Sequence, residues 1–162
     1  MAAARIWTDQ EALARHLATL RADGQRVVTA NGCFELLHVG HVRYLTAARA
    51  EGDLLVVLVN SDASMAIVKP ERESAVPAAE RMEVLAALDA VDHVVAFDEK
   101  RPTALLDRLR PSVHTKGTDY DPRTLPERDA VESHGGRIAI VGDPKDHSVT
   151  DLRRRLRARD GS

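Results

Sequence analysis

The sequence has little cysteine, few aromatic residues and no excess of either charge. Its 162 residues include one cysteine, Cys33, so no internal disulfide can form and a reducing compartment is suitable. Trp, Tyr and Phe make up 3% of the chain, which argues against the stacking surfaces that bind single-stranded nucleic acid. The formal net charge of −2 gives no broad attraction to nucleic acid or to an anionic membrane. We therefore expect a small-molecule partner and phosphate binding at a local site, with no nucleic acid or membrane partner.

Long hydrophobic runs are also missing. No run reaches the roughly 20 apolar residues that span a bilayer, and residues 1–7 lack the apolar segment of a signal peptide. We expect a cytoplasmic protein. With 44% hydrophobic and 30% charged residues, the chain suits one compact core, which predicts a single domain over residues 1–162.

Short apolar runs alternate with segments of helical periodicity along most of the chain. Residues 8–11, TDQE, have the spacing of a capping box, in which Thr8 and Glu11 bond the first amides of a helix over about 8–21. Predicted strands are 27–30, 54–59, 93–97, 112–115 and 137–141, and further predicted helices are about 40–50, 78–88, 103–109, 125–134 and 149–158. This alternation over about 26–156 predicts an α/β fold with a parallel sheet covered by helices on both faces.

The polar loop after the first predicted strand is the best candidate for a ligand site. Asn31 and Gly32 can present backbone amides there, and the next helix begins with its partial positive charge, so the loop suits a phosphate. His38 and His41 are three residues apart with the small Gly40 between them, which lets both imidazoles face one ligand. Two histidines at this spacing also occur in helices without a function. A zinc site is less consistent, because no cysteine pair or further nearby histidine completes four ligands.

Residues 31–41, NGCFELLHVGH, resemble the signature of the cytidylyltransferase-like nucleotidyltransferase superfamily of the HxGH type. Further segments are similar to the bacterial D-glycero-β-D-manno-heptose 1-phosphate adenylyltransferases, including the adenylyltransferase domain of ADP-heptose synthases. These segments are VNSDAS at 59–64, ERM at 80–82, LAALDAVD at 85–92, FDEK at 97–100 and KGTDY at 116–120. The resemblance covers about residues 26–156. It implies a Rossmann-like three-layer α/β/α sandwich and a nucleotidyltransferase of carbohydrate metabolism, which transfers AMP from ATP to heptose 1-phosphate and gives ADP-heptose and pyrophosphate.

The resemblance also implies roles for individual residues. Catalytic roles fall to His38, His41 and Lys116, the histidines as hydrogen-bond donors to the transition state rather than as bases. Nucleotide-binding roles fall to Asn31, Gly32, Cys33, Phe34, Gly40, His41, Gly117, Asp119, Ser148, Val149 and Thr150. Substrate-binding roles fall to Glu35, Asn60, Asp62, Lys69 and Arg81. Mg²⁺ is expected to arrive with ATP, bound mainly by the nucleotide phosphates with no direct protein ligand, and the chain is expected to be a homo-oligomer, with a dimer favoured.

Several of these residues also have an ordinary structural interpretation. Lys116 would suit a solvated strand end, Arg81 an exposed helix charge and Ser148 a helix N-cap. The arginines at 153–155 are typical of a solvated helix face.

Three departures from the family pattern leave the substrate open. Glu35 stands where the superfamily usually has Asp, Thr118 replaces a Gly, and residues 69–72, KPER, replace a substrate loop that contains Gly. One alternative is a CTP-dependent cytidylyltransferase for glycerol 3-phosphate or another polyol or sugar phosphate. A second alternative is a nucleotide-binding module without catalysis. Aminoacyl-tRNA synthetases use a related histidine pair, but the chain is too short and insufficiently basic for tRNA recognition.

Overall fold

The fold is built on one six-stranded parallel sheet with the order β1-β4-β3-β2-β5-β6. The computed structural model describes residues 5–144 and 148–160. The strands are β1 (Arg5–Trp7), β2 (Val27–Gly32), β3 (Leu54–Asn60), β4 (His93–Phe97), β5 (Val113–Lys116) and β6 (Arg137–Ile140). Every residue of β3 is buried, as expected of a continuous apolar run in the middle of a parallel sheet.

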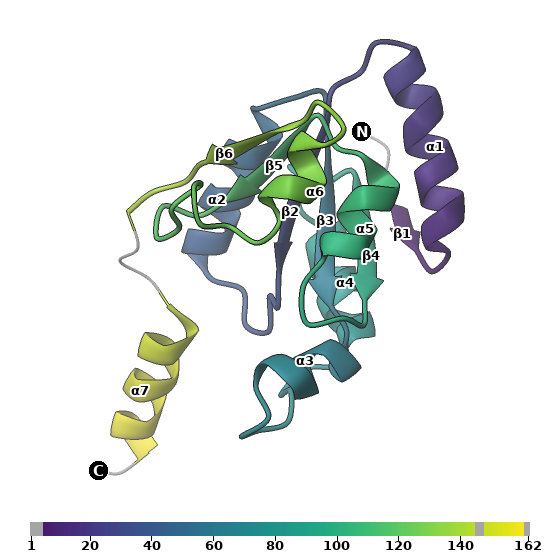
Figure 1. Cartoon of the computed structure of the whole chain (residues 1–162). Helices are drawn as coiled ribbons and strands as arrows, with labels where there is room; N and C mark the ends of the chain where they lie inside the picture. Colours follow the sequence, from purple (N-terminus) through teal and green to yellow (C-terminus); the bar gives the residue numbers. More distant parts are fainter. Residues whose placement is uncertain (1–4, 145–147, 161–162) are drawn as a thin grey trace.

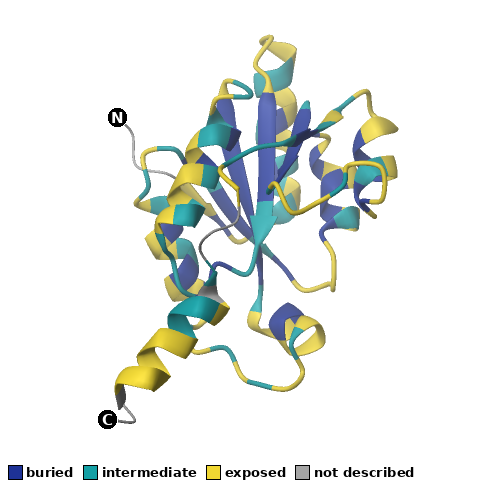
Figure 2. Cartoon of the chain, turned by 90° about the vertical axis from the view of Figure 1, so that its left-hand side faces the viewer, coloured by how far each residue is buried: buried dark blue, intermediate teal, exposed yellow. Residues whose placement is uncertain are grey.

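Helices cover both faces of the sheet and give three layers (Figure 1). One face packs against α1 (Gln10–Ala22), α5 (Thr103–Leu109) and α6 (Arg128–Glu132). The other face packs against α2 (Val39–Arg49) and α4 (Ala78–Ala86). Figure 2 shows the buried strands as the centre of the molecule. The remaining helices, α3 (Asp62–Val68) and α7 (Val149–Asp160), lie beyond the sheet, and α7 extends away from it (Figure 1).

The predicted α/β class and parallel sheet are confirmed, with differences at individual elements. The N-cap of α1 is Asp9 and not Thr8, because Asp9 Oδ1 accepts from the amides of Glu11 and Ala12 at 2.9 and 3.0 Å. The helix predicted over 125–134 is shorter and spans Arg128–Glu132. β1 and α3 were not predicted: a three-residue edge strand and a seven-residue helix are too short for a periodic signal.

The order in which the strands are added to the sheet reverses at β2. The chain proceeds from β2 to β3 and β4 on one side, then returns to place β5 on the other side of β2. Ala30 is paired with Thr115, so Asn31 and Lys116 follow side by side at the carboxyl ends of β2 and β5. Ligands of open α/β sheets bind outside such a switch point.

Candidate functional site

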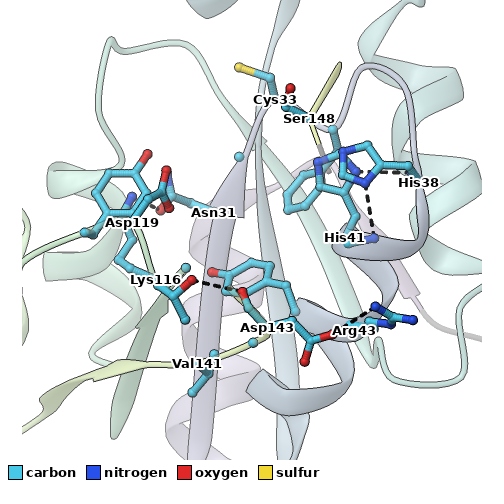
Figure 3. Close-up of a pocket in the computed structure, with 18 of the residues that line it drawn as sticks. Asn31, Cys33, His38, His41, Arg43, Lys116, Asp119, Val141, Asp143 and Ser148 are labelled. Atoms are coloured by element: carbon cyan, nitrogen blue, oxygen red, sulfur yellow. Dashed lines mark hydrogen bonds and ion pairs between the residues drawn. The ribbon is translucent and has the colours of Figure 1, made fainter. Parts of the chain in front are cut away.

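A cleft of about 400 Å³ opens at the carboxyl ends of β2 and β5. Its walls come from the loop after β2, the start of α2, the loops after β5 and β6, and the start of α7, with Lys69 at one side. In Figure 3 the histidine pair lies on one side of the cleft, and Lys116 and Asp119 lie on the other.

Close packing of Phe34 shapes the loop after β2. Phe34 has a φ of 47°, a left-handed conformation that is costly for a bulky residue, and its ring is buried against His41 with centroids 5.4 Å apart. A Cβ on Gly32 would lie 3.0 Å from this ring, so any other residue would push the ring from its place by a few tenths of an ångström. The loop thereby holds Phe34 under the histidine pair.

His38 and His41 form the entrance of α2. His38 is the N-cap: its Nδ1 accepts from the amide of Gly40 at 3.1 Å, while Nδ1 of His41 accepts from the amide of His38 at 3.3 Å. The two rings are stacked with centroids 3.9 Å apart. A nitrogen that accepts a hydrogen bond carries no proton, so the N–H of each ring is on Nε2. Burial, and secondarily the neighbouring His38, lowers the pKa of His41 to about 4, which makes His41 a neutral Nε2–H donor at pH 7.

Lys116 ends β5 and faces the same cleft. Its Nζ donates to Oδ1 of Asn31 at 2.9 Å and lies 4.6 Å from the centre of the Tyr120 ring. The residue is only 7% exposed, and burial lowers the pKa of its ammonium. The hydrogen bond therefore joins a cation at the end of β5 to the end of β2, next to the loop that carries the histidines.

The rim of the cleft is braced by contacts between loops. Thr118 Oγ1 donates to the carbonyl of Asp143 at 2.9 Å, and Arg43 on α2 forms a 3.0 Å ion pair with the Asp143 carboxylate. The hydroxyl of Tyr44 donates to the carbonyl of Thr115 at 2.8 Å. These contacts fix the loops after β5 and β6 against α2.

Glu35 is buried and bonded to its own chain. Its Oε1 accepts from Arg72 and the amide of Ala75, each at 2.7 Å, and from Arg153 of α7 at 3.0 Å. These hydrogen bonds, above all the one from Arg72, lower the pKa of Glu35 to about 2. The second oxygen, Oε2, is buried and has no hydrogen-bond partner among the described residues. Glu35 thus ties the segment after α3 and the helix α7 to the loop that carries the histidines.

Arg81 is also buried, and it bonds four oxygens of the protein. Its guanidinium donates to the carbonyls of Val76, Cys33 and Asn60 at 2.7–3.0 Å and to the Asp62 carboxylate at 2.9 Å. Its side chain is 1% exposed. In this structure Arg81 therefore joins α4 to the ends of β2 and β3 and to the start of α3.

Most of the residues predicted for the site line the cleft together. These are Asn31, Gly32, Cys33, Phe34, Glu35, His38, Gly40, His41, Lys69, Lys116, Gly117, Asp119, Ser148 and Thr150. Asn60, Asp62 and Arg81 do not line it, and their predicted contact with substrate stays a prediction. Val149 is the first residue of α7, and its side chain lies outside the described residues.

Other cleft residues were not predicted. They are Arg43, Tyr44, Thr118, Tyr120, Val141, Gly142, Asp143 and Pro144. Thr118 and Tyr120 fall inside the KGTDY segment, which is a signal that sequence reasoning could have used. The loop after β6 carries no such motif, and its place depends on the strand order of the sheet.

Two features are absent from the part of the chain that the structure describes. Within residues 5–144 and 148–160, no three His, Cys, Asp or Glu side chains gather in a way that would hold a metal ion. In the same part of the chain, no helix is long and apolar enough to cross a membrane.

Known proteins resemble this chain in sequence and in fold. The chain is 45% identical over 147 residues to the bifunctional protein HldE of Syntrophotalea carbinolica, covering 91% of this chain and 30% of that protein. It is 47% identical over 142 residues to HldE of Geobacter sulfurreducens, covering 88% and 29%. The chain thus spans less than a third of the length of these relatives. A lipopolysaccharide core biosynthesis protein from Thermoplasma volcanium has a similar structure, with a TM-score of 0.62, 25% identity and coverage of 75% of this chain and all of that one.

The family profile described as cytidylyltransferase-like matches residues 29–155, which include most of β2, all of β3 to β6 and the whole histidine segment. This match confirms the predicted nucleotidyltransferase class. The chain belongs to the cytidylyltransferase-like family.

Proposed function

We propose that the protein transfers AMP from ATP to a sugar 1-phosphate, with heptose 1-phosphate as the acceptor, and releases pyrophosphate. The observation that carries the proposal is the pair of imidazoles of His38 and His41, whose Nδ1 atoms accept amide hydrogen bonds and leave Nε2–H as the donor, in one cleft with the Lys116 ammonium. The choice of heptose and of ATP is supported by the segments at 59–64, 80–92 and 116–120 and by the similarity to HldE.

The proposed reaction needs no catalytic base from the protein. A phosphate oxygen of the sugar 1-phosphate attacks the α-phosphorus of ATP, a new P–O bond forms, and the bond to the β-phosphate oxygen breaks as pyrophosphate leaves. The nucleophile is already an anion, so the protein contributes by positioning the two phosphates and stabilising the charge on the α-phosphoryl group. The two imidazoles and the Lys116 ammonium are donors of the kind that stabilise such charge.

Mg²⁺ fits this proposal as a companion of the nucleotide. It prefers oxygen ligands, keeps several waters and is usually bound through substrate phosphates, so the phosphates of ATP would carry it. Bound to ATP, it would neutralise phosphate charge in the cleft. We also propose, from the family resemblance, that the chain forms a homodimer, which light scattering on the purified protein tests.

Pyrophosphate release tests the proposal. The protein is incubated with Mg²⁺ and each pairing of heptose 1-phosphate or glycerol 3-phosphate with ATP or CTP. Release only with heptose 1-phosphate and ATP is the expected result, whereas release only with glycerol 3-phosphate and CTP would identify a cytidylyltransferase. Nucleotide binding without any turnover across a wider panel of sugar 1-phosphates would identify a binding module and refute the proposal.

A further inference from the structure

Glu127 is a buried carboxylate that lies outside the lining of the cleft. None of the sequence motifs described above includes it. It lies in the segment between β5 and α6, where it precedes the first residue of α6, and it is only 5% exposed. Its Oε1 lies 3.8 Å from Nζ of Lys116, and its Oε2 is buried without a hydrogen-bond partner in the described chain. Glu127 does not line the cleft.

Lys116 and Glu127 form a buried ion pair. Their side chains are 9% and 6% exposed, so solvent screens the pair weakly. At 3.8 Å the interaction is a charge pair without a hydrogen bond, while the short hydrogen bond of Lys116 goes to Asn31. Glu127 therefore supplies a negative charge close to the Lys116 ammonium, and the hydrogen bond to Asn31 fixes the orientation of the Lys116 side chain.

The other groups around Lys116 do not replace this charge. Asn31 is neutral, and Tyr120 contributes a ring contact at 4.6 Å. His114 on the same strand is fully buried, and burial lowers its pKa to about 3, so it is neutral. Asp119 is the second carboxylate that opposes the loss of the Lys116 proton, and its effect is smaller than that of Glu127.

We infer that Glu127 is a positioning residue of the nucleotidyl-transfer site: its carboxylate holds Lys116 beside Asn31 as a cation before any phosphate arrives. The inference rests on the proposed function for its catalytic meaning. A buried ammonium without a counter-charge is unfavourable and loses its proton more readily, whereas a phosphate ligand needs the charged form. Glu127 does not touch the substrate and acts through Lys116.

The charge state of Lys116 is directly measurable because the chain has only four lysines. In protein labelled with ¹³C at lysine Cε, the Lys116 signal is the one lost in Lys116→Met. We expect Glu127→Gln to lower the titration midpoint of that signal by about one pH unit or more, while the other three signals stay in place. Glu132→Gln is the matched control, because it removes an exposed carboxylate at the other end of α6 and should shift nothing.

Turnover gives a second readout. In Glu127→Gln the alkaline limb of the kcat/KM profile should move to lower pH with the Lys116 signal, and Glu127→Asp should restore part of the shift. In the Lys116→Met background, Glu127→Gln should cause no further loss of kcat/KM, because its target is gone.

The two proposals fail in different ways. An unchanged Lys116 midpoint in Glu127→Gln overturns the inference, as does an additive loss of kcat/KM in the double variant. Should Glu127→Gln not fold, Glu127→Asp carries the same titration, with a smaller downward shift expected and no shift overturning the inference. The titration needs no substrate, so a wild-type protein that releases no pyrophosphate refutes the proposed function without deciding the Lys116 midpoint.

Discussion

Replacement of Glu35 by glutamine tests how the departure from the family's usual Asp is accommodated. The variant keeps the shape of the side chain but removes the charge from an oxygen that accepts three hydrogen bonds, from Arg72, Ala75 and Arg153. Bonds to a charged group contribute about 1 kcal/mol more each than neutral ones, which gives an upper value of about 3 kcal/mol. Since the two arginine side chains are 26% and 27% exposed, solvent lowers this to about 2 kcal/mol.

Urea unfolding at pH 7 measures this difference, and thermal unfolding should show a Tm lower by about 4–8 °C for a chain of this length. Glu73→Gln is the control, because Glu73 is an exposed carboxylate of the same segment.

The pH dependence of stability gives a second check. Because the pKa of Glu35 is lowered from 4.5 to about 2, its stabilisation is complete above about pH 5 and is lost as the pH falls towards 2.

The difference in unfolding free energy between wild type and Glu35→Gln should therefore be constant from about pH 6 to 8 and shrink below about pH 5. A difference below about 0.5 kcal/mol at pH 7 would refute the role of Glu35 as a structural tie. A difference that grows on acidification would refute the assigned charge state.

Three further predictions concern the histidine segment and Arg81. His41→Ala should lower kcat for pyrophosphate release by a factor on the order of 10² with an unchanged circular dichroism spectrum, because one transition-state donor is lost; an unaltered kcat would return His41 to a structural role. By ¹⁵N NMR, His41 should be neutral at pH 7 with its proton on Nε2 and titrate near pH 4, and a midpoint near 6.5 would contradict the buried, Nδ1-accepting ring. Arg81→Met should cost about 3–5 kcal/mol in urea unfolding, because it leaves buried carbonyls without donors and Asp62 without its ion pair; a cost under about 1 kcal/mol would show that these contacts are dispensable.

Much of the site was predictable because its central residues follow the ends of buried strands. His38 and His41 lie three residues apart after a buried strand, and Lys116 ends another, so the parallel sheet brings their segments to one edge. Order along the chain is enough for such residues, since the fold class determines which strand ends meet.

The partners of buried charges could not be read in this way. The arginines at 153–155 are typical of a solvated face, yet Arg153 bonds Glu35, which is 118 residues away. Arg81 has the sequence context of an exposed helix charge, but it is among the most buried side chains. Glu127 lacks any motif. In each case the interaction depends on tertiary packing that local pattern does not encode.

The hydrogen bond between Asn31 and Lys116 joins residues 85 positions apart through two strands that pair directly. Such a contact has a high sequence separation and costs loop entropy before it forms. A refolding intermediate in which β5 has not docked on β2 consequently lacks the Lys116 side of the cleft, and with it half of the proposed phosphate site. ATP should then stabilise only the native state and not this intermediate. The rate at which ATP binding returns during refolding should therefore report the docking of β5 on β2 and not the formation of the histidine segment.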